Sequence, residues 1–257
     1  MGKPILSVRD VHIRFGGITA LDGVSFDMVT GSILGLIGPN GAGKTTLFNC
    51  LSRLYSPDSG DILFDGHSIL SRPVHRIAEV GIGRTFQNIA LFQNLTVLDN
   101  VLIGTHSRAK SDFLSDGFYL PWAKRAERSA KHWAMDLINY LALGTVSAYR
   151  VADLPFGSQK RVELARALAT NPKLLLLDEP ACGLNHEEVE ELGALIRAIR
   201  KDLGISILLV EHHMNLVMAI SDSIVALNFG RKIGQGTPSE IRVEPEVIAA
   251  YLGAASI

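Results

Sequence analysis

A glycine-rich stretch at residues 38–45 restricts the fold of the chain around it more than any other feature. It fits the pattern G-x-x-x-x-G-K-S/T, with the residues Gly38, Pro39, Asn40, Gly41, Ala42, Gly43, Lys44 and Thr45. A near-continuous apolar run at 32–37 precedes it and predicts a strand buried on both faces, and a helical pattern begins at Lys44. A loop between such a strand and such a helix is the context in which this pattern cradles phosphate groups.

The residue types of this loop suit a nucleoside triphosphate. Glycines let backbone N–H groups wrap around phosphates, and the N-terminus of the following helix favours their negative charge. Lys44 can reach the β- and γ-phosphates, and Thr45 can ligate Mg²⁺. We therefore predict that residues 38–46, including Thr46, bind ATP with Mg²⁺. A plain glycine turn is the alternative, which the strand and helix on either side disfavour.

A second group of polar residues follows another buried run. Four leucines at 174–177 lead directly into Asp178 and Glu179. Because the carboxyl ends of parallel strands face the ligand crevice, Asp178 is predicted to hold Mg²⁺ through the water shell of the metal. Glu179 is predicted to orient or deprotonate the attacking water. A solvated acidic turn after a strand is the alternative interpretation.

With both elements present, the chain resembles the ATPase subunits of ABC transporters over essentially its whole length. The resemblance implies that Gln87, in the segment 84–87, contacts Mg²⁺ and the attacking water, and that His212 contacts the γ-phosphate. It implies that Phe15 stacks on adenine. Taken alone, Gln87 would be a surface amide, His212 a capping or packing residue, and Phe15 a core aromatic.

Residues 154–159 lie where the family has its signature motif, LSGGQ, but they depart from it. Pro155 replaces the serine that would meet the γ-phosphate of the opposite subunit, Phe156 replaces a glycine, and Ser158 replaces the glutamine. The resemblance leaves Gly157 and the helix N-terminus to face that phosphate. Asn185 stands where the family's D-loop usually has Asp.

The departures resemble one subfamily, the ATPases of branched-chain and hydrophobic amino-acid importers. A proline followed by an aromatic residue in the signature, the run 211–214, the aromatic stretch 113–122 and the tail 245–253 are similar to that group. Importers of urea or other small solutes share much of the pattern and remain an alternative. A soluble ABC ATPase of translation or DNA repair is disfavoured because a second nucleotide domain, long coiled coils and basic arms are absent from the sequence. Glu179 and His212 together disfavour a regulator that binds ATP without turnover.

The expected fold is a RecA-like α/β P-loop NTPase core with an antiparallel β layer and an inserted helical subdomain. Strands are predicted at 5–8, 11–15, 21–26, 62–64, 173–177 and 205–210, and helices at 123–143 and 187–201. We expect one nucleotide-binding domain over 1–257. Within it, 1–87 and 158–240 form the core and β layer, 88–157 the helical subdomain, and 241–257 a C-terminal extension.

Composition narrows the compartment and the partners. Lys and Arg number 25 against 26 Asp and Glu, so no basic field exists to attract nucleic acid. Cys50 and Cys182 lack disulfide or metal spacing, which favours a reducing cytoplasm. Apolar runs are too short to span a bilayer. The resemblance implies a cytoplasmic subunit on the inner membrane face, held there by membrane permease subunits. It also implies a second ATPase subunit, in a homo- or heterodimer, and indirectly a solute-binding protein.

The segment 87–100 is the predicted surface for the membrane subunit. Ile89, Leu91, Phe92 and Leu95 are too apolar for a purely solvated segment, and an apolar groove with a polar rim commonly receives a helix. Packing of these side chains inside the helical subdomain is the alternative.

Overall fold

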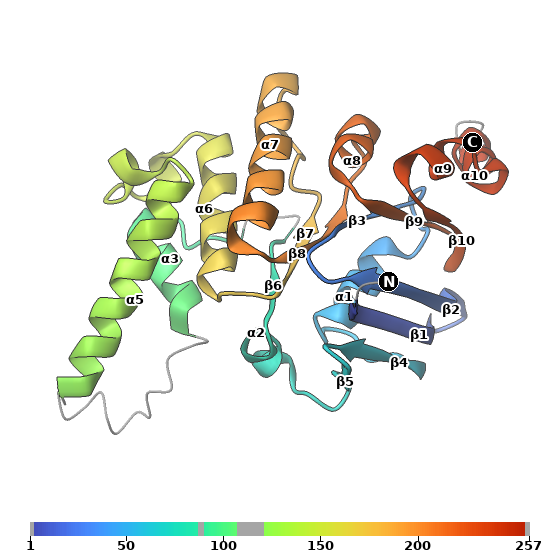
Figure 1. The fold of residues 1–257 in the computed structure, drawn as a ribbon, viewed down its shortest axis with the longest axis horizontal. Helices are drawn as coiled ribbons and strands as arrows, with labels where there is room; N and C mark the ends of the chain where they lie inside the picture. The colour runs from blue at the N-terminus through green and yellow to red at the C-terminus, as the bar shows by residue number, and fades with distance from the viewer. Residues whose placement is uncertain (1–2, 87–89, 107–120, 255–257) are drawn as a thin grey trace. The chain divides into compact units, whose positions relative to one another are not determined.

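The computed structural model describes residues 3–86, 90–106 and 121–254 (Figure 1). The chain forms two compact units. The first comprises Met1–Ile77 and Lys173–Ile257, and the second comprises Ala78–Pro172. The range 88–157, predicted as a helical subdomain, lies inside the second unit. No helix of the described residues is long and apolar enough to cross a membrane.

An antiparallel sheet opens the first unit. Its strands are β1 (Pro4–Phe15), β2 (Ile18–Val29), β4 (Ser59–Phe64) and β5 (His67–Ser68), in the order β2-β1-β4-β5. The segments predicted at 5–8 and 11–15 are one strand, because a register shift between Val8 and Val11 lets the chain continue through an irregular point. Asp10, at that point, has a left-handed φ of 46°.

Five strands of the first unit lie in a second sheet, in the order β10-β9-β3-β8-β7. They are β3 (Ile33–Ile37), β7 (Leu174–Asp178), β8 (Ser206–Val210), β9 (Ser223–Asn228) and β10 (Arg231–Gly236). Strands β7, β8, β3 and β9 are parallel, and β10 is antiparallel to β9. Every residue of β3, β7 and β8 is buried, as their continuous apolar sequences predict. Parallel strands bring their carboxyl ends to one edge, where residues 38, 179 and 211 follow.

The helices of the first unit follow these strands. They are α1 (Lys44–Leu51), α7 (His186–Leu203), α8 (Met214–Ile220), α9 (Pro238–Val243) and α10 (Pro245–Ala254). Asn185 and Glu188 form a capping box that begins α7, and Gly204 ends it with a φ of 66°. A short 3₁₀ turn (Val74–Arg76) and α2 (Ile77–Val80) lead into the second unit.

In the second unit, three helices pack on one another. They are α3 (Val97–Thr105), α5 (Pro121–Tyr140) and α6 (Phe156–Ala169), and the unit also contains the strand β6 (Ile82–Arg84). Two 3₁₀ turns, Gly144–Val146 and Val151–Asp153, connect α5 to α6. Gly104 permits α3 to approach α6 closely, since a Cβ at this position would lie 2.2 Å from the Arg166 carbonyl oxygen. The predicted helix at 123–143 corresponds to α5.

Candidate nucleotide-binding site

The loop 38–43 connects β3 to α1 with a backbone that only glycine readily adopts. Gly38, Gly41 and Gly43 have φ values of 152°, 79° and 102°. A Cβ at Gly38 would lie 2.3 Å from the Leu227 carbonyl oxygen, so the loop rests directly on β9. The Gly230 amide donates to the Ala42 carbonyl at 3.1 Å, which fixes the loop from a second side. The pattern in the sequence thus corresponds to a preformed loop.

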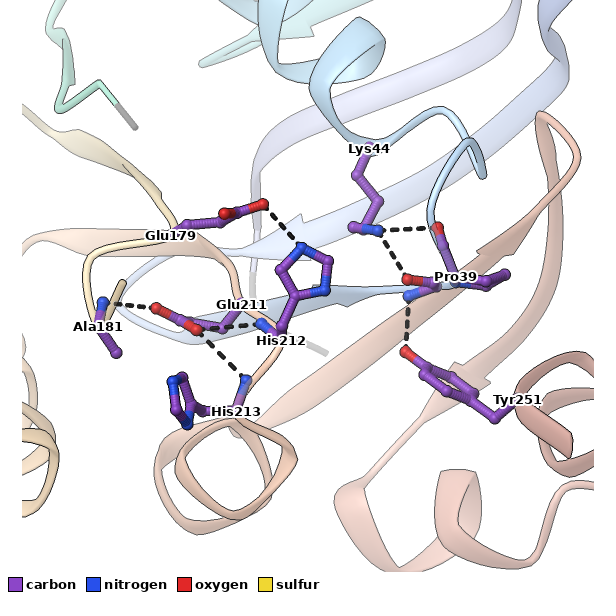
Figure 2. Close-up of polar contacts among 9 residues, drawn as sticks. Pro39, Lys44, Glu179, Ala181, Glu211, His212, His213 and Tyr251 are labelled. Atoms are coloured by element: carbon purple, nitrogen blue, oxygen red, sulfur yellow. Dashed lines mark hydrogen bonds and ion pairs between the residues drawn. The ribbon is translucent and has the colours of Figure 1, made fainter. Parts of the chain in front are cut away.

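Lys44, the first residue of α1, is buried, and its side chain reaches back to this loop. Its Nζ donates to the carbonyl oxygens of Gly38 at 2.6 Å and Pro39 at 2.9 Å (Figure 2). Burial lowers the pKa of the Lys44 ammonium, and the nearby Glu179 carboxylate raises it in part. Thr45, one residue on, is exposed at the start of α1. A cation and a hydroxyl therefore lie beside the backbone N–H groups of a helix N-terminus, an arrangement that suits a polyphosphate.

Two further side chains come from the carboxyl ends of β7 and β8. Glu179 follows β7, and its Oε1 lies 2.7 Å from Nε2 of His212, which follows β8 (Figure 2). The Glu179 amide also donates to the Val210 carbonyl at 2.9 Å. Glu179 has a left-handed φ of 48°, a conformation that costs a non-glycine residue about 1–3 kcal/mol and occurs often at functional sites. Asp178, the last residue of β7, is buried.

A buried carboxylate, Glu211, connects the loop that follows β7 to the loop that follows β8. Its Oε1 accepts a hydrogen bond from the Ala181 amide at 2.6 Å (Figure 2). Its Oε2 accepts from the amides of His212 at 3.0 Å and His213 at 3.3 Å. The side chain is only 2% exposed. No role for Glu211 is predicted from the sequence, although its place directly after a buried strand, as for Glu179, is a pattern that could have indicated one.

We expect Glu211→Gln to slow turnover more than it weakens substrate binding. The amide keeps one acceptor oxygen, but its NH₂ group must face at least one backbone N–H donor, which displaces the loop of Glu179 or of His212. We predict that kcat falls about 10-fold while KM changes less than about 3-fold. Steady-state ATPase assays check this, with Glu190→Gln as the matched control because Glu190 is exposed on α7. A lowered melting temperature with an unchanged kcat would contradict the positioning role.

Phe15, the predicted adenine contact, ends β1 and is 45% exposed. Its ring meets Tyr55 edge-on, with centroids 5.1 Å apart. The alternative that Phe15 is a core aromatic is therefore wrong. The two adjoining rings, both of them exposed, provide an aromatic surface on which a planar base could stack.

The predicted signature region forms the start of α6 in the second unit. Pro155 is the N-cap residue, and Phe156 and Gly157 begin the helix, whose first turn contains no acidic residue. Phe156 is 46% exposed, and its ring centroid lies 5.7 Å from Nζ of Lys160. The partial positive charge of such a helix N-terminus favours an anion. Gln87, the other predicted site residue of this unit, lies outside the described residues.

The loop 38–43, the carboxylates of Asp178 and Glu179 and the imidazole of His212 together define this chain as a P-loop nucleotide-binding protein. A family model described as "ABC transporter" matches residues 21–182, and one described as "Branched-chain amino acid ATP-binding cassette transporter" matches residues 231–256. The chain belongs to the ABC transporter family, as its ATP-binding cassette, and the RecA-like ABC ATPase fold and the ATPase class predicted from the sequence are confirmed.

Curated relatives match over the full chain. The high-affinity branched-chain amino acid transport ATP-binding protein BraF of Pseudomonas aeruginosa is 44% identical over 99% of this chain and 100% of its own length. LivG of Escherichia coli, with the same description, is 42% identical with the same coverage. Among solved structures, the ADP conformation of MJ1267, an ATP-binding cassette of an ABC transporter, is 30% identical with a TM-score of 0.85, covering 98% of this chain and 99% of that one.

Proposed function

We propose that this chain binds and hydrolyses ATP to energise import of branched-chain amino acids through separate membrane permease subunits. One observation carries the proposal. BraF and LivG, whose names state branched-chain amino acid transport, match the chain from end to end at 44% and 42% identity. The match of residues 231–256 to a branched-chain family model supports the same solute class independently of the catalytic motifs.

Within this proposal, the phosphates of ATP lie on the loop 38–46. Lys44 exchanges its contacts with the carbonyls of Gly38 and Pro39 for contacts with the β- and γ-phosphates, and the Phe15 ring stacks on adenine. Thr45 and Asp178 offer hydroxyl and carboxylate oxygens, the ligand types that Mg²⁺ prefers, and Gln87 is the third proposed ligand. The chemistry that Mg²⁺ supplies when bound is neutralisation of charge on the phosphate oxygens.

Glu179 and His212 are the proposed catalytic pair. Glu179 accepts a proton from the attacking water as the water oxygen bonds to the γ-phosphorus and the bond to the β-γ bridging oxygen breaks. His212, 2.7 Å from Glu179, holds that carboxylate in place and contacts the γ-phosphate. Gln87 is proposed to contact the same water. The strained backbone at Glu179 supports a functional role for this position.

A second ATPase chain completes the proposed site. The α6 N-terminus, with Gly157 in its first turn, is proposed to face the γ-phosphate bound to the opposite chain, in a homo- or heterodimer. The helical subdomain 88–157 supplies this surface, while 1–87 and 158–240 supply the core and 241–257 the C-terminal extension. Permease subunits hold the assembly at the inner face of the membrane, and a solute-binding protein delivers the amino acid to them.

Co-expression with permease subunits and a solute-binding protein tests the proposal. Vesicles containing the assembly and internal ATP are expected to accumulate labelled leucine, and accumulation should stop when ATP is replaced by a non-hydrolysable analogue. Uptake of urea in place of leucine would favour the alternative importer class. A chain that hydrolyses ATP without any association with permeases would favour a soluble ABC ATPase.

The structure separates the apolar residues of the proposed permease-docking segment by exposure. Leu91 is buried at 8% exposed, whereas Phe92 and Leu95 are 52% and 39% exposed, and Ile89 lies outside the described residues. Buried Asn100 fixes the segment, because it accepts from the Phe92 amide at 2.9 Å and donates to the Phe92 carbonyl at 3.0 Å. For Leu91, packing inside the second unit is therefore the better interpretation.

We expect Phe92→Asp and Leu95→Asp to lose co-purification with the permease while the isolated chain keeps its fold. An exposed position accepts a charge within about 0.5 kcal/mol, whereas Leu91→Asp should destabilise the chain by more than about 3 kcal/mol. Thermal unfolding and pull-down measure the two effects. Val243→Asp, at an apolar residue 69% exposed on α9, is the matched control. Unfolding by every variant that loses the permease would contradict the docking assignment.

A further inference from the structure

The C-terminal helix α10 reaches the first residue of the phosphate loop. The Gly38 amide donates to the Tyr251 hydroxyl at 2.9 Å, across 213 residues of sequence (Figure 2). The carbonyl of the same Gly38 accepts from Lys44 Nζ at 2.6 Å. One glycine therefore connects the side chain of the C-terminal helix to the lysine of the loop.

Helix α10 presents Tyr251 from a fixed position. Ile241 of α9 and Val247 of α10 are buried, and a Cβ on Gly234 of β10 would lie 3.2 Å from each of these two side chains. Glycine at this position thus allows both helices to pack closely against β10. A capping box between Thr237 and Glu240 sets the start of α9. The tyrosine is carried by packed secondary structure and not by a free tail.

The Gly38 backbone has little freedom to move its N–H group toward another hydrogen-bond acceptor. Gly38 is buried, and its position against the Leu227 carbonyl leaves no room for a side chain. A buried N–H that loses its acceptor costs free energy comparable to a whole hydrogen bond. Burial also raises the pKa of the Tyr251 phenol, with the Gly38 amide lowering it to a smaller extent, so the hydroxyl is protonated at neutral pH.

We propose that Tyr251 is a positioning residue of the nucleotide site. Its hydroxyl fixes the backbone of Gly38 through the Gly38 N–H, and the Gly38 carbonyl in turn sets the position of Lys44 Nζ. The inference rests on the proposed ATP-binding function. It gives the segment 231–256, matched by the branched-chain family model, a role in the site itself, because Tyr251 of this segment holds the first residue of the phosphate loop by a hydrogen bond. Nucleotide affinity then depends on a helix that contributes no phosphate ligand.

Tyr251→Phe tests the hydroxyl while keeping the ring. We expect the Kd for ATP with Mg²⁺ to rise about 5-fold, the effect of losing one hydrogen bond that orders the loop. Hydrogen exchange of the Gly38 amide, followed in nucleotide-free protein, should accelerate about 5-fold or more. The matched control is Tyr149→Phe, at a tyrosine 58% exposed, which should leave both quantities unchanged.

A second variant separates positioning from packing. Tyr251→Leu removes the ring and the hydroxyl together. If only the packing of the ring mattered, Tyr251→Leu would weaken ATP binding while Tyr251→Phe would bind ATP like the wild type. That result would overturn the proposal. Faster Gly38 exchange and weaker binding in both variants support it. Because exchange is measured without nucleotide, it tests the contact even in a protein that bound no ATP. Failure of the wild type to bind ATP would instead overturn the proposed function.

Discussion

Lys44→Ala is expected to raise the Kd for ATP on the order of 100-fold or more. Lys44 is the buried cation that follows the loop 38–43, and its Nζ lies within 3 Å of the Gly38 and Pro39 carbonyl oxygens, beside the proposed phosphate position. A charge-assisted contact to a phosphate contributes about 1.5–3 kcal/mol, and the proposed site gives this ammonium contacts with two phosphates. Equilibrium titration with a fluorescent ATP analogue measures the loss.

Controls make this result specific to the phosphate contact. Lys201→Ala removes an exposed lysine from the last turn of α7 and should leave the Kd unchanged. Lys44→Arg keeps the charge but places a planar fork where the loop holds a compact ammonium, so affinity should also fall. Circular dichroism of each variant confirms that the fold is intact. Wild-type affinity in Lys44→Ala would remove the loop from the proposed site.

The parts of the site that can be predicted from the sequence are those formed by consecutive residues. The glycine pattern at 38–45 and the leucine run before Asp178 each combine an apolar strand with polar residues at its carboxyl end, so local periodicity indicates both the strand and the position of the polar group. The structure ends β7 at Asp178 and places Glu179 directly after it, as this reasoning predicts. It also buries β3, β7 and β8 completely.

Contacts between distant segments could not be predicted in this way. Glu211 and Ala181 lie 30 residues apart, and Tyr251 and Gly38 lie 213 apart. Their meeting depends on which strands are neighbours and on how α10 packs against β10, and no local pattern records either. Likewise, Leu91 and Phe92 are adjacent and equally apolar, yet one is buried and the other exposed because Asn100 fixes the turn of the chain between β6 and α3.

Glu179→Gln is expected to keep ATP binding and to lower kcat about 1000-fold. The amide oxygen can still accept from His212 Nε2, now 2.7 Å from the carboxylate, so the geometry of the pair persists. What is lost is the basicity and charge needed to take a proton from water, and general-base catalysis contributes about 100- to 10,000-fold. Steady-state ATPase assays measure kcat, and titration should give a Kd within about 3-fold of the wild type.

The same variant should accumulate ATP-bound dimers, because hydrolysis no longer separates the two chains. Size-exclusion chromatography with light scattering would detect the dimer in ATP and a monomer in ADP. His212→Ala tests the pairing: if His212 acts by holding Glu179, the double variant should be about as slow as Glu179→Gln alone, since residues that act as a unit are strongly non-additive. Glu187→Gln, at an exposed residue in the first turn of α7, is the charge-matched control and should hydrolyse ATP normally. Rapid hydrolysis by Glu179→Gln would assign the base to another residue, and additive losses in the double variant would separate His212 from Glu179 in function.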